Sequence, residues 1–154
     1  MYRIKIFLPS SRVPPGWLHL IGGLGQLIES FPCLGKADNE RALAKGNPSR
    51  DPVRPFGDTP TGLYLPTKVE RFSGTHERIG LAWIPMVGGG RANDQAATAC
   101  APGKMQRTGL GIHAGRDGSK LFPTYGCIRM LTGDFNDLIA TIGDEMVQIE
   151  VENL

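Results

Sequence analysis

The chain has 154 residues, a length at which one domain can bury most of its unfolded surface in a single core. Its formal net charge is only +2, and its Lys and Arg residues are neither clustered nor interleaved with aromatic residues, so we expect no nucleic-acid groove. Its three cysteines show no C-x-x-C or His-rich spacing, so we expect no metal site and no cofactor.

Glycine and proline are frequent along the whole chain. Twenty-one glycines and twelve prolines separate short apolar runs, which is typical of a mainly β chain with long loops. The N-terminal part predicts three short strands, over residues 1–8, 17–21 and 24–31. The composition from 36 to 58 is polar and indicates a long surface connection, with a short helix over Asn39 to Ala44.

Two more strands are predicted over 62–71 and 80–87. The glycine run that follows opens a stretch of small and polar residues over 88–108. This stretch is either a lid over an active site or a surface loop with no role. Leu110 and Ile112 alternate with glycines, so a short strand is expected to end at His113.

The C-terminal part predicts a helix followed by a strand. Thr132 is a candidate N-cap, and Gly143 is expected to end the helix. Alternation over 145–152 predicts a closing strand with one face on the core. The apolar positions of the helix recur at i, i+3, i+4 and i+7, and they are Phe135, Leu138, Ile139 and Ile142.

The stretch from Thr108 to Met130 carries the strongest functional signal. His113 precedes Cys127 by fourteen residues, and Gly126 stands directly before the sulfur. A nucleophilic thiol needs a nearby base and a set of donors for the oxyanion that it generates. This short segment can supply all three from two adjacent strands, so it favours acyl transfer at a cysteine.

Taken singly, these residues have simpler interpretations. A free cysteine is usually a small buried hydrophobe, and a disulfide between Cys33 and Cys100 is left open. His19 and His76 are interpreted as strand and loop residues without a catalytic role. The close pairing of His113 with Cys127 favours function, because a glycine before the sulfur permits a turn that aims backbone N–H groups at one point.

The segment resembles the L,D-transpeptidase catalytic domain of bacterial cell-wall enzymes. The signature of that family is a histidine, a variable loop, and then Ser/Thr-His-Gly-Cys-hydrophobic-Arg/Asn. A second match is the stretch Gly57 to Gly62, which looks like the family's Thr-Pro-x-Gly turn, and the resemblance covers roughly residues 53 to 154. The residues that match the signature are His113, Thr124, Gly126, Cys127, Ile128 and Arg129.

The chain departs from the family pattern at two points. Tyr125 stands where the family has a second histidine, which changes the side-chain chemistry beside the oxyanion site and the shape of the acceptor pocket. The loop from His113 to Thr124 is several residues shorter than the usual spacing. Both departures bear on specificity.

The resemblance implies an L,D-transpeptidase-like β-sandwich with one or two short helices, formed by a single domain over 1–154. His113 would draw the proton from Cys127, and the backbone N–H groups of Gly126 and Cys127 would hold the oxyanion. The backbone carbonyl of Ala114 would orient His113, a role for which Asp117 competes.

The substrate that the resemblance implies is the peptidoglycan stem tetrapeptide. Arg129, Tyr125 and Thr124 would contact it, and Arg129 either meets a stem carboxylate or forms a salt bridge that fixes the turn. A neighbouring amine as acceptor gives a transpeptidase that forms 3→3 cross-links. Water as acceptor gives an L,D-carboxypeptidase that releases terminal D-Ala. A secreted antibacterial effector is one form of this alternative. A third alternative is a non-catalytic module that binds wall peptides.

Such a substrate places the protein in the periplasm or cell wall. The N-terminus alternates like a strand and lacks the apolar core of a secretory signal, and no segment reads as a membrane span. The expectation is either export by a route without such a signal, as in phage lysis or contact-dependent secretion, or a sequence that begins after a removed signal. The strand-like start favours a natural N-terminus.

Overall fold

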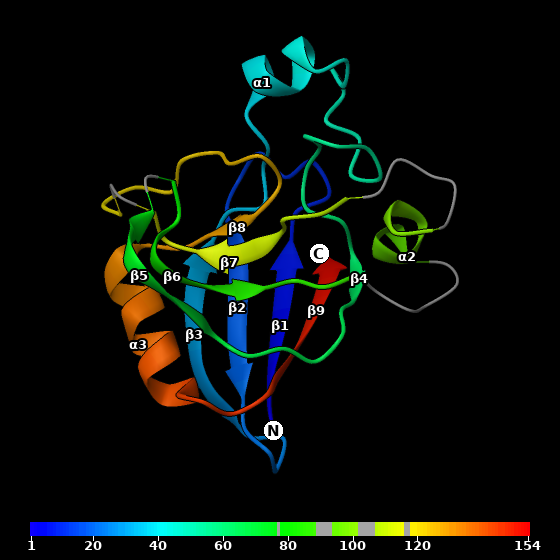
Figure 1. Ribbon diagram of the computed structural model, residues 1–154. Coiled ribbons are helices and arrows are strands. Elements are labelled where there is room, and N and C mark those ends of the chain that lie inside the picture. The colour runs from blue at the N-terminus through cyan, green and yellow to red at the C-terminus, as the bar shows by residue number, and fades with distance from the viewer. Residues whose placement is uncertain (77, 89–93, 102–106, 116–117) are drawn as a thin grey trace.

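The computed structural model describes residues 1–154 except 77, 89–93, 102–106 and 116–117. The chain is mainly β, as predicted, and its strands form two mixed sheets. The larger sheet has the strand order β3-β2-β1-β9-β4 (Figure 1). Its strands are β1 (Tyr2–Leu8), β2 (Gly16–Ile21), β3 (Leu27–Cys33), β4 (Gly62–Leu63) and β9 (Val147–Asn153).

The smaller sheet has the order β5-β6-β7-β8 and lies in front of the larger one in Figure 1. Strands β1 and β9 pair in parallel, as do β7 and β8, whereas the other pairs are antiparallel. The strands of this sheet are β5 (Glu70–His76), β6 (Gly80–Pro85), β7 (Gly111–His113) and β8 (Ile128–Arg129).

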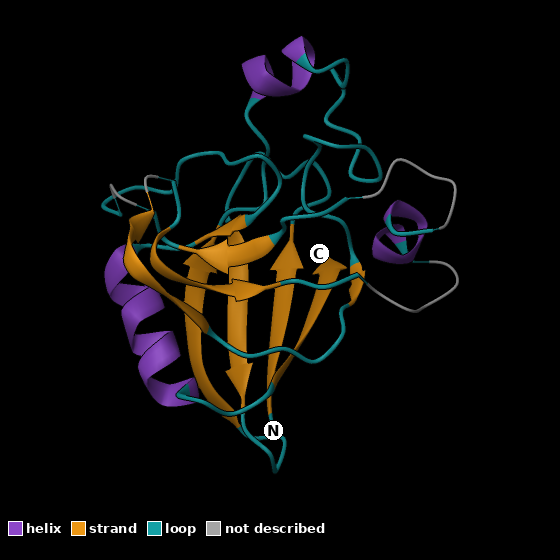
Figure 2. Cartoon of the chain, in the orientation of Figure 1, coloured by secondary structure: helices purple, strands orange, loops and turns teal. Residues whose placement is uncertain are grey.

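The part of the chain that the structure describes contains three short helices, which lie at the periphery (Figure 2). Helix α1 (Asn39–Ala44) has the predicted bounds, and the Asp38 side chain caps it by accepting from the N–H of Arg41. Helix α2 (Gln95–Ala99) lies beside β4, and helix α3 (Thr132–Ile142) flanks the sheets on the opposite side. Helix α1 projects beyond the sheets at one end.

The core lies between the two sheets and under α3. Ile4, Ile6 and Leu8 of β1 are fully buried, as the alternation of this strand predicts. Burial of each such side chain contributes about 1.5–3 kcal/mol. The apolar stripe of α3 is buried as predicted, and all these residues belong to one hydrophobic cluster that also takes side chains from β6 and β9.

Several predicted boundaries are wrong. The third strand starts at Leu27 and not at 24, because Gly22 donates to the Gln26 carbonyl and closes a turn. The strand expected over 62–71 is broken: only Gly62–Leu63 pairs as a strand there, and β5 begins at Glu70. The intervening Pro66 has no backbone N–H to donate.

Predictions for the helices and the closing strand also need correction. Part of the stretch 88–108 forms α2, so the described residues contain three helices and not one or two. Residues 89–93 and 102–106 lie outside the described residues, and the lid remains a prediction. Leu131, not Thr132, is the N-cap of α3, whereas Gly143 ends the helix as predicted. The alternation predicted for the closing strand fails at Glu150, which is buried between Ile149 and Val151. Among the described residues, no helix is long and apolar enough to span a membrane.

Candidate active site

The pairing of β7 with β8 brings His113 and Cys127 together. Ile112 pairs with Ile128 and His113 pairs with Arg129 in a parallel register. Side chains alternate across a strand, so Cys127, His113 and Arg129 project to the same side of the sheet. All three line one cavity.

The turn directly before Cys127 is stabilised by Thr124, which is part of it. The Thr124 hydroxyl donates to the Cys127 carbonyl at 2.8 Å and accepts from the N–H of Gly126 at 3.0 Å. Gly126 has a φ of 117°, a conformation that favours glycine. The Gly126 N–H is therefore engaged inside the turn, which differs from its predicted role as an oxyanion donor.

The stretch Gly57 to Gly62 anchors this turn from the other side. Thr59 is fully buried, and its hydroxyl lies 2.6 Å from the carbonyl of Gly126. A Cβ at Gly126 would lie 2.7 Å from the carbonyl oxygen of Gly57, so the two segments are in direct contact. The second sequence match therefore contacts the backbone of the cysteine turn.

Arg107 clamps the same two segments together. Its guanidinium donates to the carbonyls of Pro52, Gly57 and Asp58 and, at 3.3 Å, to that of Tyr125. Burial lowers the pKa of Arg107. Since one side chain donates to carbonyls of both segments, Arg107 acts as a positioning residue for the turn.

Cys127 is a buried thiol on the cavity wall. Its Sγ lies 3.5 Å from the carbonyl oxygen of Gly109. Burial raises the pKa of the thiol, and a backbone hydrogen bond from Gly111 and the charge of Arg107 act in the opposite direction. The balance keeps Cys127 protonated in the unliganded protein.

His113 is also neutral at rest. Burial and, to a smaller degree, the charges of Arg129 and His76 lower the pKa of His113 to about 3. Its buried Nδ1 has no hydrogen-bond partner among the described residues. The Ala114 carbonyl therefore does not accept from this nitrogen, and Asp117 lies outside the described residues. A neutral imidazole can accept a proton from the thiol.

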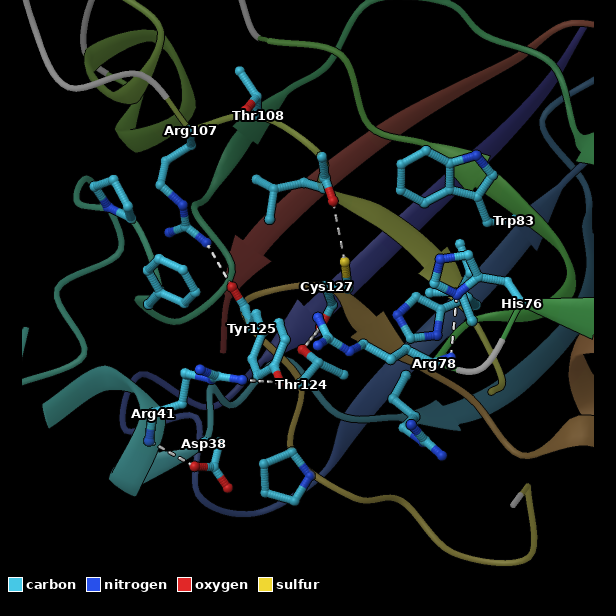
Figure 3. A pocket seen from close by; sticks show the side chains of 18 residues that line it. Asp38, Arg41, His76, Arg78, Trp83, Arg107, Thr108, Thr124, Tyr125 and Cys127 are labelled. Carbon is cyan, nitrogen blue, oxygen red and sulfur yellow. Dashed lines mark hydrogen bonds between the residues drawn. The ribbon is translucent and has the colours of Figure 1, made fainter. Parts of the chain in front are cut away.

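The cavity has a volume of about 820 Å³ (Figure 3). We call the β7–β8 side with His113 and Cys127, together with the turn at Gly126 that precedes the cysteine, the inner wall. The side of the cavity formed by Arg41, Phe56, Arg78 and Tyr125 we call the outer wall. Other lining residues are Asp38, His76, Trp83, Arg107, Thr124 and Arg129.

The charge of the cavity is strongly unbalanced. Its described lining contains four arginines and one carboxylate, that of Asp38. The fourth arginine, Arg129, is largely buried, and its guanidinium lies over the ring of Phe122 at 5.6 Å. An excess of positive charge suits an acidic ligand.

The remaining cysteines do not join the site. No disulfide forms among Cys33, Cys100 and Cys127, so the disulfide left open between Cys33 and Cys100 is absent from the described residues. Cys33 lies in the core, where burial raises its pKa to about 12. Within the described ranges, no group of three or more His, Cys, Asp or Glu side chains could hold a metal ion.

Sequence reasoning missed much of the cavity wall. Asp38, Arg41 and Phe56 come from the connection 36–58, which was interpreted only as a surface segment. His76 was given no role, yet it lines the cavity and affects the pKa of His113. No local motif marks these residues, because they reach the site only through tertiary packing.

The chain matches no protein-family model and no curated protein sequence. The interpretation of the site therefore depends on its geometry and on the motif residues themselves.

Proposed function

We propose that the protein is a cysteine-dependent L,D-transpeptidase that acts on peptidoglycan stem tetrapeptides. The observation that carries the proposal is that His113, on β7, and Cys127, directly before the paired strand β8, line one cavity. The excess of arginine there suits the acidic stem. The two mixed β-sheets support the finer proposal of an L,D-transpeptidase-like β-sandwich.

The reaction begins from a neutral thiol and a neutral imidazole. As Sγ attacks the carbonyl between the third residue of the stem and D-Ala, His113 takes the thiol proton. The amide C–N bond then breaks, the imidazolium returns the proton to the leaving amine, and D-Ala departs from a thioester. An amine of a second stem attacks the thioester, forms the 3→3 cross-link and restores the thiol.

The oxyanion donors differ in part from the prediction. Because the Gly126 N–H is bonded to Thr124, we assign the oxyanion to the Cys127 N–H. Gly126 then acts through the conformation of the turn. The substrate lies outside the cytoplasm, so the proposal also implies action in the periplasm or cell wall.

Mass spectrometry of purified disaccharide-tetrapeptide tests the proposal. Wild-type protein should release D-Ala, Cys127→Ala should not, and Cys100→Ala, a cysteine variant outside the cavity, should match wild type. Cross-linked dimers identify the transpeptidase, whereas tripeptide alone identifies the L,D-carboxypeptidase. Unchanged substrate with every variant contradicts both activities.

A second candidate is a module that binds wall peptides without turnover. The raised pKa of Cys127 and the engaged N–H of Gly126 favour it, because neither prepares the site for attack. Alkylation by iodoacetamide at pH 7 separates the candidates. An enzyme that uses His113 as a base should be alkylated more slowly after His113→Ala, whereas a binding module should react at the same rate in both forms.

A further inference from the structure

Two arginines from distant segments converge on Tyr125. The guanidinium carbon of Arg41 lies 4.9 Å from the centroid of the tyrosine ring, and that of Arg78 lies 4.8 Å from it. Both distances are typical of cation–π contacts. Arg41 comes from α1 and Arg78 follows β5, and in Figure 3 the two side chains approach Tyr125 from opposite sides.

Most hydrogen-bond donors of this pair are available. Arg41 Nη2 donates to the Tyr125 hydroxyl at 2.9 Å, which uses one of five N–H groups. The Arg78 side chain makes no hydrogen bond within the part of the chain that the structure describes. In that same part, the ion pair is Arg50 with Asp58, so neither arginine of the outer wall has a carboxylate partner.

The arrangement keeps two like charges close together. Both guanidinium groups contact the same ring, so they lie within about 10 Å of each other, the screening length at 0.1 M salt. The ring itself is supported by Phe56, whose centroid lies 5.8 Å away at a steep angle. The Asp38 side chain caps α1 and so fixes the backbone of Arg41. Two cations held against one ring gain from an anion that accepts from their remaining N–H groups.

The position of the pair relates it to the reaction. Tyr125 precedes Cys127 by two residues and Arg129 follows it by two, and all three line the cavity. The arginines that contact Tyr125 and Arg129 therefore line the same cavity as the sulfur. A peptide bound at Cys127 would lie within this cavity and could place a carboxylate near these cations.

We infer that Arg41 and Arg78, held against Tyr125, form a binding site for one carboxylate of an acidic peptide substrate. The identity of that peptide as the stem tetrapeptide rests on the proposed function. Loss of a charged hydrogen-bond partner corresponds to about 10-fold to 100-fold in affinity. Tyr125, in place of the family's histidine, thus becomes a support for substrate recognition.

The test combines arginine variants with amidated substrates. Arg41→Gln and Arg78→Gln are compared with Arg3→Gln, which removes an exposed arginine outside the cavity. The substrates are the tetrapeptide and analogues that each have one carboxylate amidated. The readouts are kcat/KM for D-Ala release and, in a Cys127→Ala background, the dissociation constant by calorimetry.

We expect each cavity variant to weaken binding of the free tetrapeptide by about 10-fold or more, and Arg3→Gln to leave it unchanged. Amidation of the carboxylate that this pair binds should weaken binding by a similar factor and should abolish the effect of the arginine variants. Cavity variants that behave like Arg3→Gln overturn the inference, as does an arginine effect that persists with every amidated analogue.

Failure of the proposed function is distinguishable. Binding that depends on the arginines and on one carboxylate, without release of D-Ala, supports the carboxylate site and contradicts the enzyme. Release of D-Ala that does not depend on the arginines supports the enzyme and contradicts the carboxylate site. Absence of both release and binding overturns both.

Discussion

The inner and outer walls of the cavity are held in different ways. On the inner wall, His113 and Cys127 are buried, and the turn of Gly126 is fixed by hydrogen bonds to Thr124 and Thr59. On the outer wall, Arg41 and Arg78 are held mainly by contact with the ring of Tyr125. The inner wall is thus held by buried hydrogen bonds, whereas the two arginines of the outer wall are held mainly through one aromatic ring.

The largest expected effect is on the inner wall, at Gly126. An alanine there would adopt a φ of 117° and place its Cβ 2.0 Å from Nη2 of Arg107 and 2.7 Å from the carbonyl oxygen of Gly57. Strain and overpacking together should cost about 4 kcal/mol in unfolding free energy. Urea denaturation measures this loss.

Gly133→Ala is the matched control for Gly126→Ala. Its Cβ would meet nothing within 4 Å, and a helical alanine should stabilise the protein by about 0.5–1 kcal/mol. Equal effects at the two glycines would mean that the inner wall is not rigid.

The second prediction concerns pH. The pKa of His113 is about 3 in the folded protein against 6.5 for a free histidine, so the unfolded chain binds more protons between these values. The contribution of neutral His113 to the stability of the fold is complete above pH 6.5 and is lost as the pH falls toward 3. Relative to His113→Gln, the free energy of unfolding of wild type should fall by about 1.4 kcal/mol for each unit by which the pH is lowered in this window.

Urea unfolding of both proteins at pH 7, 5.5 and 4.5 gives this difference, because carboxylates common to both cancel. A difference in stability that stays constant with pH would show that His113 is not buried in its neutral form.

The third prediction is smaller and tests the anchor of the turn. Thr59→Val removes the hydroxyl that reaches the Gly126 carbonyl and leaves that carbonyl without this donor. We expect a loss of about 1–3 kcal/mol by thermal or urea unfolding. Thr141→Val, which removes an exposed hydroxyl bonded within α3, should change stability by less than about 0.5 kcal/mol.

The smallest effect is expected on the outer wall. Arg78→Gln removes an exposed side chain whose described contact is with the Tyr125 ring, so stability should change by less than about 1 kcal/mol. The same calorimetric scan that measures this change also reports whether the variant folds. A loss of stability as large as that of Thr59→Val would show that Arg78 helps to stabilise the fold. The two walls would then not differ in how they are held.

Local patterns predicted the elements well where periodicity was strong. The alternation of β1, the apolar stripe of α3 and the bounds of α1 follow from neighbouring residues alone. Boundaries were missed where a turn hydrogen bond decided them, as at Gly22, or where a proline interrupted a run, as at Pro66.

The site was predictable only in part, for a physical reason. Cys127, His113 and Gly126 lie close in sequence, so their pairing is visible as a motif. Arg41 and Arg107 reach the cavity from segments far apart in the chain, and no spacing rule connects them to Cys127. The engagement of the Gly126 N–H by Thr124 depends on turn geometry that composition does not specify.

The parallel register of β7 and β8 has a consequence for how such a site can change. The ladder aligns His113 with Arg129, two residues after Cys127, and this alignment depends on the pairing of the two strands. A change in the number of residues that connect the strands can leave the pairing intact. His113 and Cys127 would then keep their relative positions while the connecting chain differs in length.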